Sequence, residues 1–306
     1  MKRILITGIN SYIGNSLERY LTMYQKEHNE AAWQIDRISL RDGTWKQVSF
    51  VGYDTIFHVA GIAHADIGKV SEEAKAMYYH INCDMAEQAA AKAKAEGVKQ
   101  FIYMSSVIVY GDSAPVGKRK HITAMTKPDP ANFYGDSKYQ AELKLQKLQA
   151  DDFQIAVIRA PMIYGKGSKG NFPMLVRLAA KTCVFPNIQN ERSMLYVENL
   201  AEFTRRLIEA GIGGIFFPQN AEYVTTAEMV RLIGEMLGRK VRLWRILNPF
   251  VVLSSKTPGK IGRLTNKAFG SLTIDTELSS IDKNHSSPNI TDYQVYSLKE
   301  SIKRSV

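Results

Sequence analysis

A tyrosine and a lysine four residues apart, Tyr134 and Lys138, are the residues of this sequence best suited to chemistry. Positions i and i+4 share one face of a helix, so both side chains can point into the same cleft. A free tyrosine has a pKa of about 10, and it is a poor base at neutral pH unless a cation and a hydroxyl stabilise its phenolate. Lys138 supplies the cation and Ser106 the hydroxyl, so we predict that Tyr134 is an acid/base catalyst.

The N-terminal segment from Ile4 to Gly14 predicts a strand, a tight turn and the start of a helix. Gly8 and Gly14 permit an unusual turn and close packing, and the amides of the following helix N-terminus suit a pyrophosphate. Ser11 replaces the glycine of the more familiar spacing and partly blocks close approach of the backbone to phosphate. An ordinary turn is the alternative, but the first strand of an alternating chain is the place expected for dinucleotide binding.

The end of the second predicted strand bears on the choice of dinucleotide. A carboxylate there would bind the ribose hydroxyls of NAD, whereas an arginine would pair with the 2′-phosphate of NADP. Arg41 with Ser39 favours NADP, while Asp36 or Asp42 could still serve NAD. The alternative for Arg41 is an ordinary surface residue.

Short apolar runs alternate with helical patterns along the first two-thirds of the chain, which is typical of an α/β fold with a doubly wound parallel sheet. The predicted strands are Arg3–Thr7, Trp33–Leu40, Thr55–Val59, Gln100–Ser105, Gln154–Arg159 and Gly214–Phe217. The predicted helices are Ile13–Lys26, Glu73–Glu96, Tyr134–Ala150, Phe172–Lys181, Val197–Ala210 and Thr226–Leu237.

The pattern loosens after Tyr164, which predicts a smaller C-terminal, substrate-binding portion. We assign residues 1–165 and 190–220 to a dinucleotide-binding domain, and residues 166–189 and 221–306 to a substrate-binding domain. The segment from Ser254 to Asn289, rich in Ser, Asn and Pro, is predicted to be mostly loop.

The composition predicts a cytoplasmic protein that is not secreted. The chain has 306 residues, of which 45% are hydrophobic and 23% charged, enough for a sizeable core. Its N-terminus resembles a short buried strand, whereas a signal peptide needs a longer apolar stretch. Cys83 and Cys183 lack metal-ligand spacing and are too few for a disulfide framework, so we expect two buried packing residues, a reducing compartment and no bound metal.

The net charge of +10 is unevenly placed, because residues 239–267 hold eight basic residues and no acidic one. Basic residues interleaved with apolar ones could attract an anionic membrane surface, in a weak association, or a nucleic acid. We interpret the stretch as a solvated rim around a site for an acidic ligand. We expect no nucleic-acid partner.

In this order, the motifs resemble the extended short-chain dehydrogenase/reductase family, in particular its nucleotide-sugar epimerase, reductase and dehydratase branch, whose dinucleotide-binding part is a Rossmann fold. The resemblance covers most of the chain. It is carried by Thr7-Gly8…Gly14, His58-Val-Ala-Gly61, Asn82, Ser105-Ser106-Val-Ile-Val-Tyr110-Gly111, Tyr134-x-x-x-Lys138, Arg159-Ala-Pro161-Met-Ile-Tyr164-Gly165 and Arg192-Ser-Met-Leu-Tyr-Val197.

The resemblance implies a role for each matching residue. Tyr134 would be the general acid/base, Lys138 would bind the nicotinamide ribose, and Ser106, rather than Ser105, would hydrogen-bond the reacting oxygen. Asn171 and Arg192 match substrate-binding positions for the nucleotide diphosphate, whereas Arg159 and Lys169 match ion-paired surface groups, and Asn82 would fix backbone. The residues implied to contact the cofactor are Thr7, Gly8, Asn10, Ser11, Tyr12, Ile13, Gly14, Ser39, Arg41, Val59, Ala60, Gly61, Asn82, Lys138 and Pro161.

The residues that follow Ser106 bear on the reaction. Relatives that eliminate water carry an Asp-Glu pair there, because elimination needs two further acid/base groups. Val107 and Ile108 stand in its place, which disfavours a dehydratase. The resemblance therefore implies oxidoreduction at C4 of a nucleotide sugar, expected to be UDP-linked, by a 4-epimerase of surface-polysaccharide synthesis.

Two other functions stay open. The first is an NADPH-dependent reductase of nucleotide 4-keto sugars, and Arg41 favours it because a reductase consumes NADPH. The second is a non-catalytic NADP-binding regulatory protein. The resemblance also implies a homodimer that pairs through the helices at Glu73–Glu96 and Tyr134–Ala150.

Overall fold

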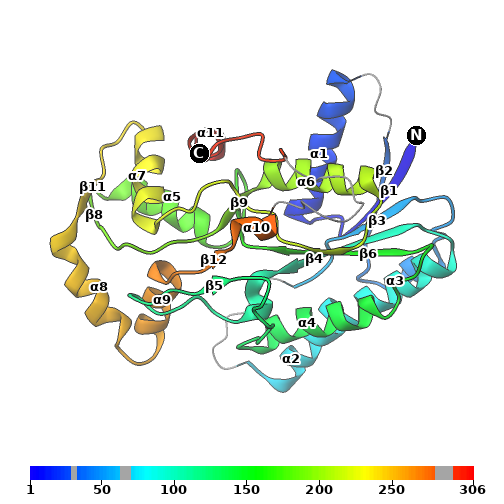
Figure 1. The fold of residues 1–306 in the computed structure, drawn as a ribbon, viewed down its shortest axis with the longest axis horizontal. Helices are drawn as coiled ribbons and strands as arrows, with labels where there is room; N and C mark the ends of the chain where they lie inside the picture. Colours follow the sequence, from blue (N-terminus) through cyan, green and yellow to red (C-terminus); the bar gives the residue numbers. More distant parts are fainter. Residues whose placement is uncertain (29–32, 63–69, 280–291) are drawn as a thin grey trace.

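The centre of the fold is a six-stranded parallel sheet (Figure 1). The computed structural model describes residues 1–28, 33–62, 70–279 and 292–306. In spatial order the strands are β10 (Gly214–Phe216), β6 (Gln154–Ala160), β4 (Gln100–Ser106), β3 (Thr55–His58), β1 (Lys2–Thr7) and β2 (Trp33–Ile38). All six predicted strands are present, and the doubly wound parallel α/β sheet is confirmed.

Both faces of the sheet are buried, which explains the near-continuous apolar strands. Successive side chains of a strand point to opposite faces. In β1, Ile4 and Ile6 join one hydrophobic cluster, whereas Leu5 joins the cluster on the other side. A strand covered on both faces therefore needs apolar residues at every position rather than at alternate ones.

Helices cover the two faces in separate layers (Figure 1). On one face α1 (Tyr12–Glu27) packs beside α6 (Val197–Ala210). The other face holds α2 (Glu72–Tyr79), α3 (Met85–Ala95) and α4 (Phe133–Gln146). Ala86, Ala89, Ala90 and Ala93 of α3 are fully buried, and their small side chains let the helix lie close to the sheet.

The single helix predicted for residues 73–96 is interrupted. A π-helical turn at His80–Asp84 separates α2 from α3 and contains the fully buried Asn82. Such a turn inserts one extra residue, which redirects the side chains around it and often marks a functional position.

The strand order reverses direction at β1, because β2 lies on one side of it and β3 on the other. In open α/β sheets, ligands bind in the crevice outside the carboxyl ends of the strands at such a reversal. The segments after Thr7 and His58 lie at this edge. The fold alone therefore places a candidate binding crevice between the loops that follow β1 and β3.

A further hydrophobic cluster packs residues of 164–197 with residues of 224–241 and Ile302. This cluster joins residues assigned to both predicted domains, and the boundary between the domains remains a prediction. The remaining elements are β5 (His121–Ile122), β7 (Met162–Tyr164), α5 (Asn171–Lys181), β8 (Val184–Pro186), β9 (Met194–Tyr196), α7 (Thr226–Met236), β11 (Arg242–Trp244), α8 (Asn248–Ser255), α9 (Lys260–Phe269), β12 (Thr273–Ile274), α10 (Thr276–Ser279) and α11 (Leu298–Ser305).

Two expectations for this part of the chain are wrong. The segment predicted as loop, Ser254–Asn289, contains α9, because the apolar residues Ile261, Leu264 and Ala268 recur at helical spacing between its glycines. Residues 280–289 of that segment lie outside the described residues. Cys83 is buried as expected, but Cys183 is exposed, since it lies in the short connection between α5 and β8.

In the described part of the chain, every helix is too short or too polar to cross a bilayer.

Candidate active site

The turn after β1 depends on Gly8. Its φ of +90° is in the region that favours glycine, and an added Cβ would lie 3.1 Å from the backbone of Ala60. The loops after β1 and β3 therefore touch at Gly8. Gly14 faces the sheet, where a Cβ would lie 3.0 Å from Ile6 Cγ2, so the predicted close packing of helix and sheet is present.

Ser11, which stands where the familiar spacing has a glycine, also begins the next helix. It is the N-cap of α1, and its hydroxyl oxygen accepts a hydrogen bond from the Gly14 N–H at 3.3 Å. Asn10 is exposed beside it, and Tyr12 and Ile13 form the first turn of α1. The helix N-terminus that the sequence predicted for a pyrophosphate therefore points at the crevice edge of the sheet.

Two arginines lie near the carboxyl end of β2, and only one was considered from the sequence. Arg41 is exposed, and its backbone N–H donates to Ser39 Oγ at 3.3 Å, so Ser39 and Arg41 share one turn. Arg37 donates to the Ile9 carbonyl and to Asn15, and it pairs with Glu18 at 2.9 Å. Arg37 therefore connects β2 to the turn after Gly8 by hydrogen bonds, whereas Arg41 is exposed to solvent.

The loop after β3 is held by Asn82. The Asn82 side-chain oxygen accepts from the Ile62 N–H at 2.8 Å, and the side-chain NH₂ donates to the Ile62 carbonyl at 3.2 Å and to Ser137 Oγ at 3.1 Å. An added Cβ on Gly61 would lie 2.9 Å from Asn82 Oδ1 and 3.2 Å from Lys138 Nζ. Asn82 thus fixes backbone, as expected, and Gly61 keeps the space above Lys138 clear.

The start of α4 positions Tyr134. Asn132 is the N-cap, and its side-chain oxygen accepts from the N–H groups of Tyr134 and Gly135, both at 3.1 Å. At Gly135 an added Cβ would lie 2.7 Å from the Ile108 carbonyl oxygen, so α4 packs directly on the segment that follows Ser106. The ring of Tyr78 packs edge-on against Tyr134 with the centroids 6.2 Å apart.

Lys138 lies one helical turn further along α4 and is buried. Its ammonium donates to the Met104 carbonyl at 3.0 Å and lies 4.7 Å from the ring centre of Tyr103, both on β4. Burial lowers the pKa of Lys138 from 10.5 to about 8, and the nearby Glu142 carboxylate opposes that shift. Lys138 is therefore a buried cation held against the strand that ends at Ser106.

The pKa of Tyr134 differs from the sequence expectation. Burial raises it from 10.0 to about 12, and the Tyr78 phenol adds to the shift. The expected lowering of the Tyr134 pKa by Lys138 is absent, and the Lys138 ammonium donates to the Met104 carbonyl. In this structure Tyr134 is accordingly a neutral phenol, the form that donates a proton.

Ser106 and Ser105 have different surroundings. Ser106 is half-buried at the end of β4, where its Oγ accepts from the Ile108 N–H at 3.3 Å. Ser105 is buried and donates to Glu142. The structure thus keeps Ser105 within a buried polar cluster, whereas the catalytic role of Ser106 stays a prediction.

That buried polar cluster is the feature that the sequence reasoning missed. Arg159 pairs with Glu142 at 2.6 Å and donates to the Tyr110 hydroxyl at 2.6 Å, and both charged side chains are less than 10% exposed. Arg159 was expected as an ion-paired surface group, so the pairing is right and the surface position is wrong. The available signal was Glu142, which follows Tyr134 and Lys138 at the same four-residue spacing on α4.

The predicted substrate residues lie apart from this centre. Among the described contacts, neither Asn171, the first residue of α5, nor Arg192 touches Ser106, Tyr134 or Lys138. Arg192 is half-buried and donates to the carbonyls of Lys267 at 2.9 Å and Ala268 at 3.3 Å at the end of α9. Burial lowers the pKa of Arg192. Pro161 is buried directly after β6.

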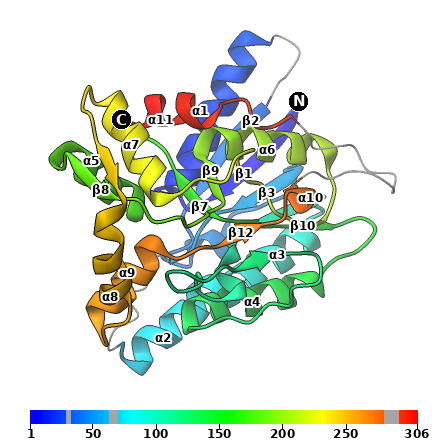
Figure 2. The same cartoon turned by 60° about the vertical axis from the view of Figure 1, so that its left-hand side comes forward.

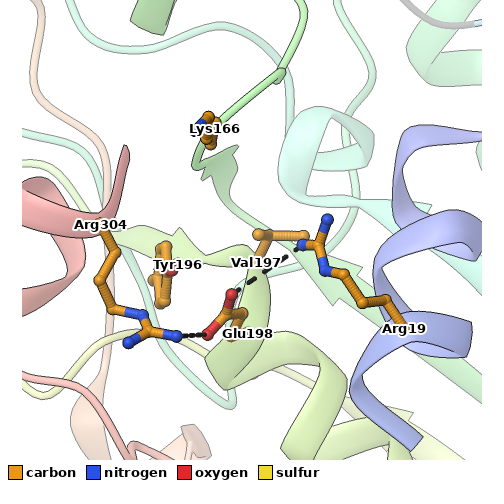
Figure 3. A pocket seen from close by; sticks show the side chains of 6 residues that line it. All are labelled: Arg19, Lys166, Tyr196, Val197, Glu198 and Arg304. Atoms are coloured by element: carbon orange, nitrogen blue, oxygen red, sulfur yellow. Dashed lines mark hydrogen bonds and ion pairs between the residues drawn. The ribbon is translucent and has the colours of Figure 1, made fainter. Parts of the chain in front are cut away.

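A cavity of about 270 Å³ lies outside this centre, lined by Arg19, Lys166, Tyr196, Val197, Glu198 and Arg304. Figure 3 shows Glu198 between Arg19 and Arg304, at 3.9 and 3.1 Å respectively. None of these residues was predicted for the site. Because the carboxylate already neutralises part of the positive charge, we do not assign the cavity a role in catalysis.

Comparison with known proteins assigns the chain to a family. Residues 4–216 match the NAD dependent epimerase/dehydratase family, a span that runs from β1 to β10. The chain belongs to that family. The predicted resemblance is confirmed, and with it an enzyme that uses a nicotinamide dinucleotide.

Two curated relatives match most of the chain. A UDP-glucose 4-epimerase from Vibrio cholerae is 28% identical over 294 residues, covering 90% of this chain and 87% of the relative. An N-acetyl-alpha-D-glucosaminyl-diphospho-ditrans,octacis-undecaprenol 4-epimerase from Escherichia coli O157:H7 is 24% identical and covers 87% of this chain and 82% of the relative.

Solved structures share the fold. A UDP-glucuronic acid 4-epimerase from Bacillus cereus in complex with NAD has a TM-score of 0.67 at 15% identity and covers 99% of this chain and 97% of its own. A dTDP-4-dehydrorhamnose reductase from Bacillus anthracis in complex with NADP has a TM-score of 0.62 at 23% identity and covers 79% of this chain and 83% of its own.

The residues at the crevice fit a dinucleotide. A Cβ at Gly61 would fill the space beside Asn82 and Lys138, and the positive-φ turn at Gly8 leads into a capped helix N-terminus. His58 is fully buried, and its Nδ1 forms a hydrogen bond with Thr7 Oγ1 at 3.1 Å. Burial lowers the pKa of His58 to about 3, so the imidazole ring is neutral.

Proposed function

We propose that this chain catalyses NAD(P)-dependent oxidoreduction at C4 of a nucleotide-linked hexose, as a UDP-hexose or UDP-N-acetylhexosamine 4-epimerase. The observation that carries the proposal is the placement of Tyr134 and Lys138 on one face of α4, packed against the strand that ends at Ser106. These residues stand beside the loops after β1 and β3, where the dinucleotide fits.

Each residue has a defined task in this reaction. A nicotinamide dinucleotide held at the crevice would supply the exchange of hydride at C4. Tyr134 takes the proton of the C4 hydroxyl in the oxidation and gives it back in the reduction. Ser106 would donate a hydrogen bond to the reacting oxygen. The buried Lys138 ammonium would favour the phenolate once it turns from the Met104 carbonyl towards Tyr134.

Val107 and Ile108 supply no second acid/base group. Val107 is 8% exposed and belongs to an apolar cluster with Tyr110 and Phe217. An elimination of water would need a base and an acid besides Tyr134. The surroundings of Ser106 therefore support epimerisation or reduction over dehydration.

A 4-keto-sugar reductase is the second candidate, and Arg41 favours it. Arg41 is exposed beside Ser39 at the end of β2 and forms no ion pair with the described residues. A free guanidinium there suits the 2′-phosphate of NADP, the cofactor that a reductase consumes. Replacement of Arg41 by Ala is expected to lower the affinity for NADP more than that for NAD, and equal losses for the two dinucleotides would contradict the assignment.

Arg192 supports a diphosphate on the substrate. Its side chain donates to neutral carbonyls and pairs with no carboxylate among the described residues, so its charge is available for an anion. The Escherichia coli relative is named for a substrate whose sugar is attached to undecaprenyl diphosphate rather than to a nucleotide. A lipid diphosphate is therefore an alternative carrier of the sugar substrate.

Incubation of the purified enzyme with UDP-sugars and no added reductant tests the proposal. Interconversion of C4 epimers is the expected result. If turnover instead requires NADPH and a 4-keto sugar, the reductase is correct. If the enzyme is inert towards nucleotide sugars and converts a sugar on polyprenyl diphosphate, then the nucleotide carrier is wrong. A cytoplasmic role in polysaccharide synthesis and a homodimer belong to the same proposal.

A further inference from the structure

The segment from Arg242 to Phe269 forms an outlying hairpin of β11, α8 and α9. Figures 1 and 2 show α8 and α9 at the margin of the molecule, away from the central sheet. No residue of α8 is buried, and Gly262 is the one buried residue of α9. We call residues 242–269 the α8–α9 hairpin.

The two helices of the hairpin pack on each other rather than on the core. An added Cβ on Gly262 would collide with the Thr257 carbonyl oxygen, so α9 crosses close to the end of α8. Asn266 donates to the Ser255 carbonyl at 2.9 Å and accepts from the Val116 N–H at 2.9 Å. The hairpin is thus an ordered element that is attached to the body at both ends, through the pairing of β11 with β8 and through the end of α9.

Large apolar side chains of the hairpin face solvent. Their exposed fractions are 73% for Ile246, 67% for Phe250, 68% for Leu253, 64% for Ile261 and 51% for Leu264, and Trp244 is 45% exposed. Val252 is 38% exposed as well. Exposed apolar residues are common singly, but seven within one small element indicate a surface that contacts a membrane or a protein partner.

The positive charge of the hairpin region indicates an anionic partner. All eight basic residues at positions 239–267 are exposed, and the sequence has no acid between Glu235 and Asp275. None of the eight pairs with a carboxylate among the residues that the structure describes. The basic residues are Arg239, Lys240, Arg242, Arg245, Lys256, Lys260, Arg263 and Lys267.

We propose that the α8–α9 hairpin docks on an anionic membrane surface, with Phe250, Leu253 and Ile261 in the interface and the basic residues at the lipid headgroups. Apolar residues and tryptophan beside unpaired cations are the combination that binds helices to such surfaces. A solvated rim around an acidic ligand explains the cations but leaves the exposed Phe, Leu and Ile without a role.

The attachment of the hairpin links this surface to the substrate. Arg192 donates to the carbonyls of Lys267 and Ala268 at the end of α9. A docked hairpin would therefore hold Arg192, the residue proposed for the substrate diphosphate, near the lipid headgroups. This link rests on the proposed function, whereas the docking itself does not.

Co-sedimentation with vesicles tests the docking. The full chain is mixed at physiological salt with vesicles of phosphatidylcholine alone or of equal parts phosphatidylcholine and phosphatidylglycerol. We expect binding only to the second. The charge-reversal variant Lys256→Glu/Lys260→Glu/Arg263→Glu is expected to lower the bound-to-free ratio by about tenfold or more. The matched control Lys99→Glu/Lys118→Glu/Lys127→Glu, which changes exposed lysines elsewhere by the same net charge, should keep most of the binding.

Trp244 provides a second readout, because the other two tryptophans, Trp33 and Trp45, are buried at 8% and 2% exposure. Its fluorescence should shift to shorter wavelength when anionic vesicles are added, and Trp244→Phe should abolish the shift. The pair Phe250→Ser/Leu253→Ser should weaken binding, whereas the control pair Val51→Ser/Met125→Ser should not.

Three results would overturn the docking: no sedimentation with anionic vesicles, equal binding of the hairpin and control variants, or a dimer in light scattering that Phe250→Ser/Leu253→Ser converts to monomer. The last result would assign the hairpin to a second copy of the chain. Epimerase activity is measured separately on water-soluble UDP-sugars without vesicles, so a failure of the docking and a failure of the proposed reaction are distinguishable.

Discussion

At the scale of single residues, the candidate site contains Tyr134 and Lys138, and burial favours the neutral form of both side chains. Burial raises the pKa of Tyr134 to about 12 and lowers that of Lys138 to about 8. Each shift disfavours the charged form. Oxidation of a sugar hydroxyl would use the Tyr134 phenolate together with a Lys138 ammonium that has turned from the Met104 carbonyl, since each charge then compensates the other.

The lowered pKa of Lys138 predicts a conflict between stability and activity. Lys138 binds a proton more weakly in the native state than in the unfolded chain, so its buried charge lowers the free energy of unfolding below pH 8. This loss is relieved as the pH rises from 8 to 10.5. Lys138→Met should therefore be inactive, yet its free energy of unfolding at pH 7 should exceed that of the wild type by about 1–3 kcal/mol.

Urea denaturation at several pH values measures this difference, which should shrink between pH 8 and 10.5. Lys144→Met is the control, because Lys144 is partly exposed and pairs with Asp84 and Glu87, so its removal should bring no gain. A variant at Lys138 that is less stable than the wild type at every pH would show that the buried ammonium is not strained.

At the scale of secondary-structure elements, α4 joins the reacting groups to a buried ion pair. Tyr134, Lys138 and Glu142 occur at successive four-residue intervals, and Glu142 holds both Arg159 on β6 and Ser105 on β4. The helix is therefore fixed against two strands by charge as well as by packing. That fixation sets the position of Tyr134 relative to Ser106.

Removal of the Glu142 carboxylate should destabilise the protein strongly. Glu142→Gln would leave the Arg159 charge buried and uncompensated, at an expected loss of about 3–5 kcal/mol in the free energy of unfolding. Glu228→Gln is the matched control, since its pair with Arg231 is about 39% exposed and should contribute less than about 1 kcal/mol. Thermal and urea unfolding compare the two. Equal small losses would mean that the buried pair contributes nothing.

The sequence predicted the elements better than it predicted the details of the site. Apolar strands buried on both faces and the helix spacing of Tyr134 and Lys138 are visible in a single chain. The π-helical turn at Asn82, the role of Ser11 as a helix cap and the burial of Arg159 depend on contacts between segments far apart in the sequence. Helix α9 was missed because its short amphipathic pattern lies within a segment rich in Ser, Asn and Pro.

At the scale of the whole molecule, two surfaces remain for partners. The α8–α9 hairpin lies at the margin of the substrate-binding portion, and α2 to α4 lie on the opposite face of the sheet from α1 and α6 (Figure 1). Met77 on α2 and Leu143 on α4 are 51% and 37% exposed. A dimer through these helices would leave the hairpin free to reach a membrane.

We predict a dimer that forms through α2–α4. Light scattering at micromolar concentration should give the mass of two chains, and Leu143→Glu should give the mass of one, since a carboxylate would be buried in the interface. Leu237→Glu serves as the control because Leu237, 38% exposed, follows α7 and lies outside the proposed interface. A monomeric wild type would contradict the proposal.

The central claim is that Tyr134 exchanges the proton while the dinucleotide exchanges hydride. The most direct test compares wild type, Tyr134→Phe and the control Tyr139→Phe, each loaded with dinucleotide and mixed with sugar nucleotide while the nicotinamide absorbance is followed. We predict unchanged dinucleotide affinity in all three and a rate of transfer about 100- to 10,000-fold lower in Tyr134→Phe alone. Transfer by Tyr134→Phe at a rate close to that of the wild type would contradict the account.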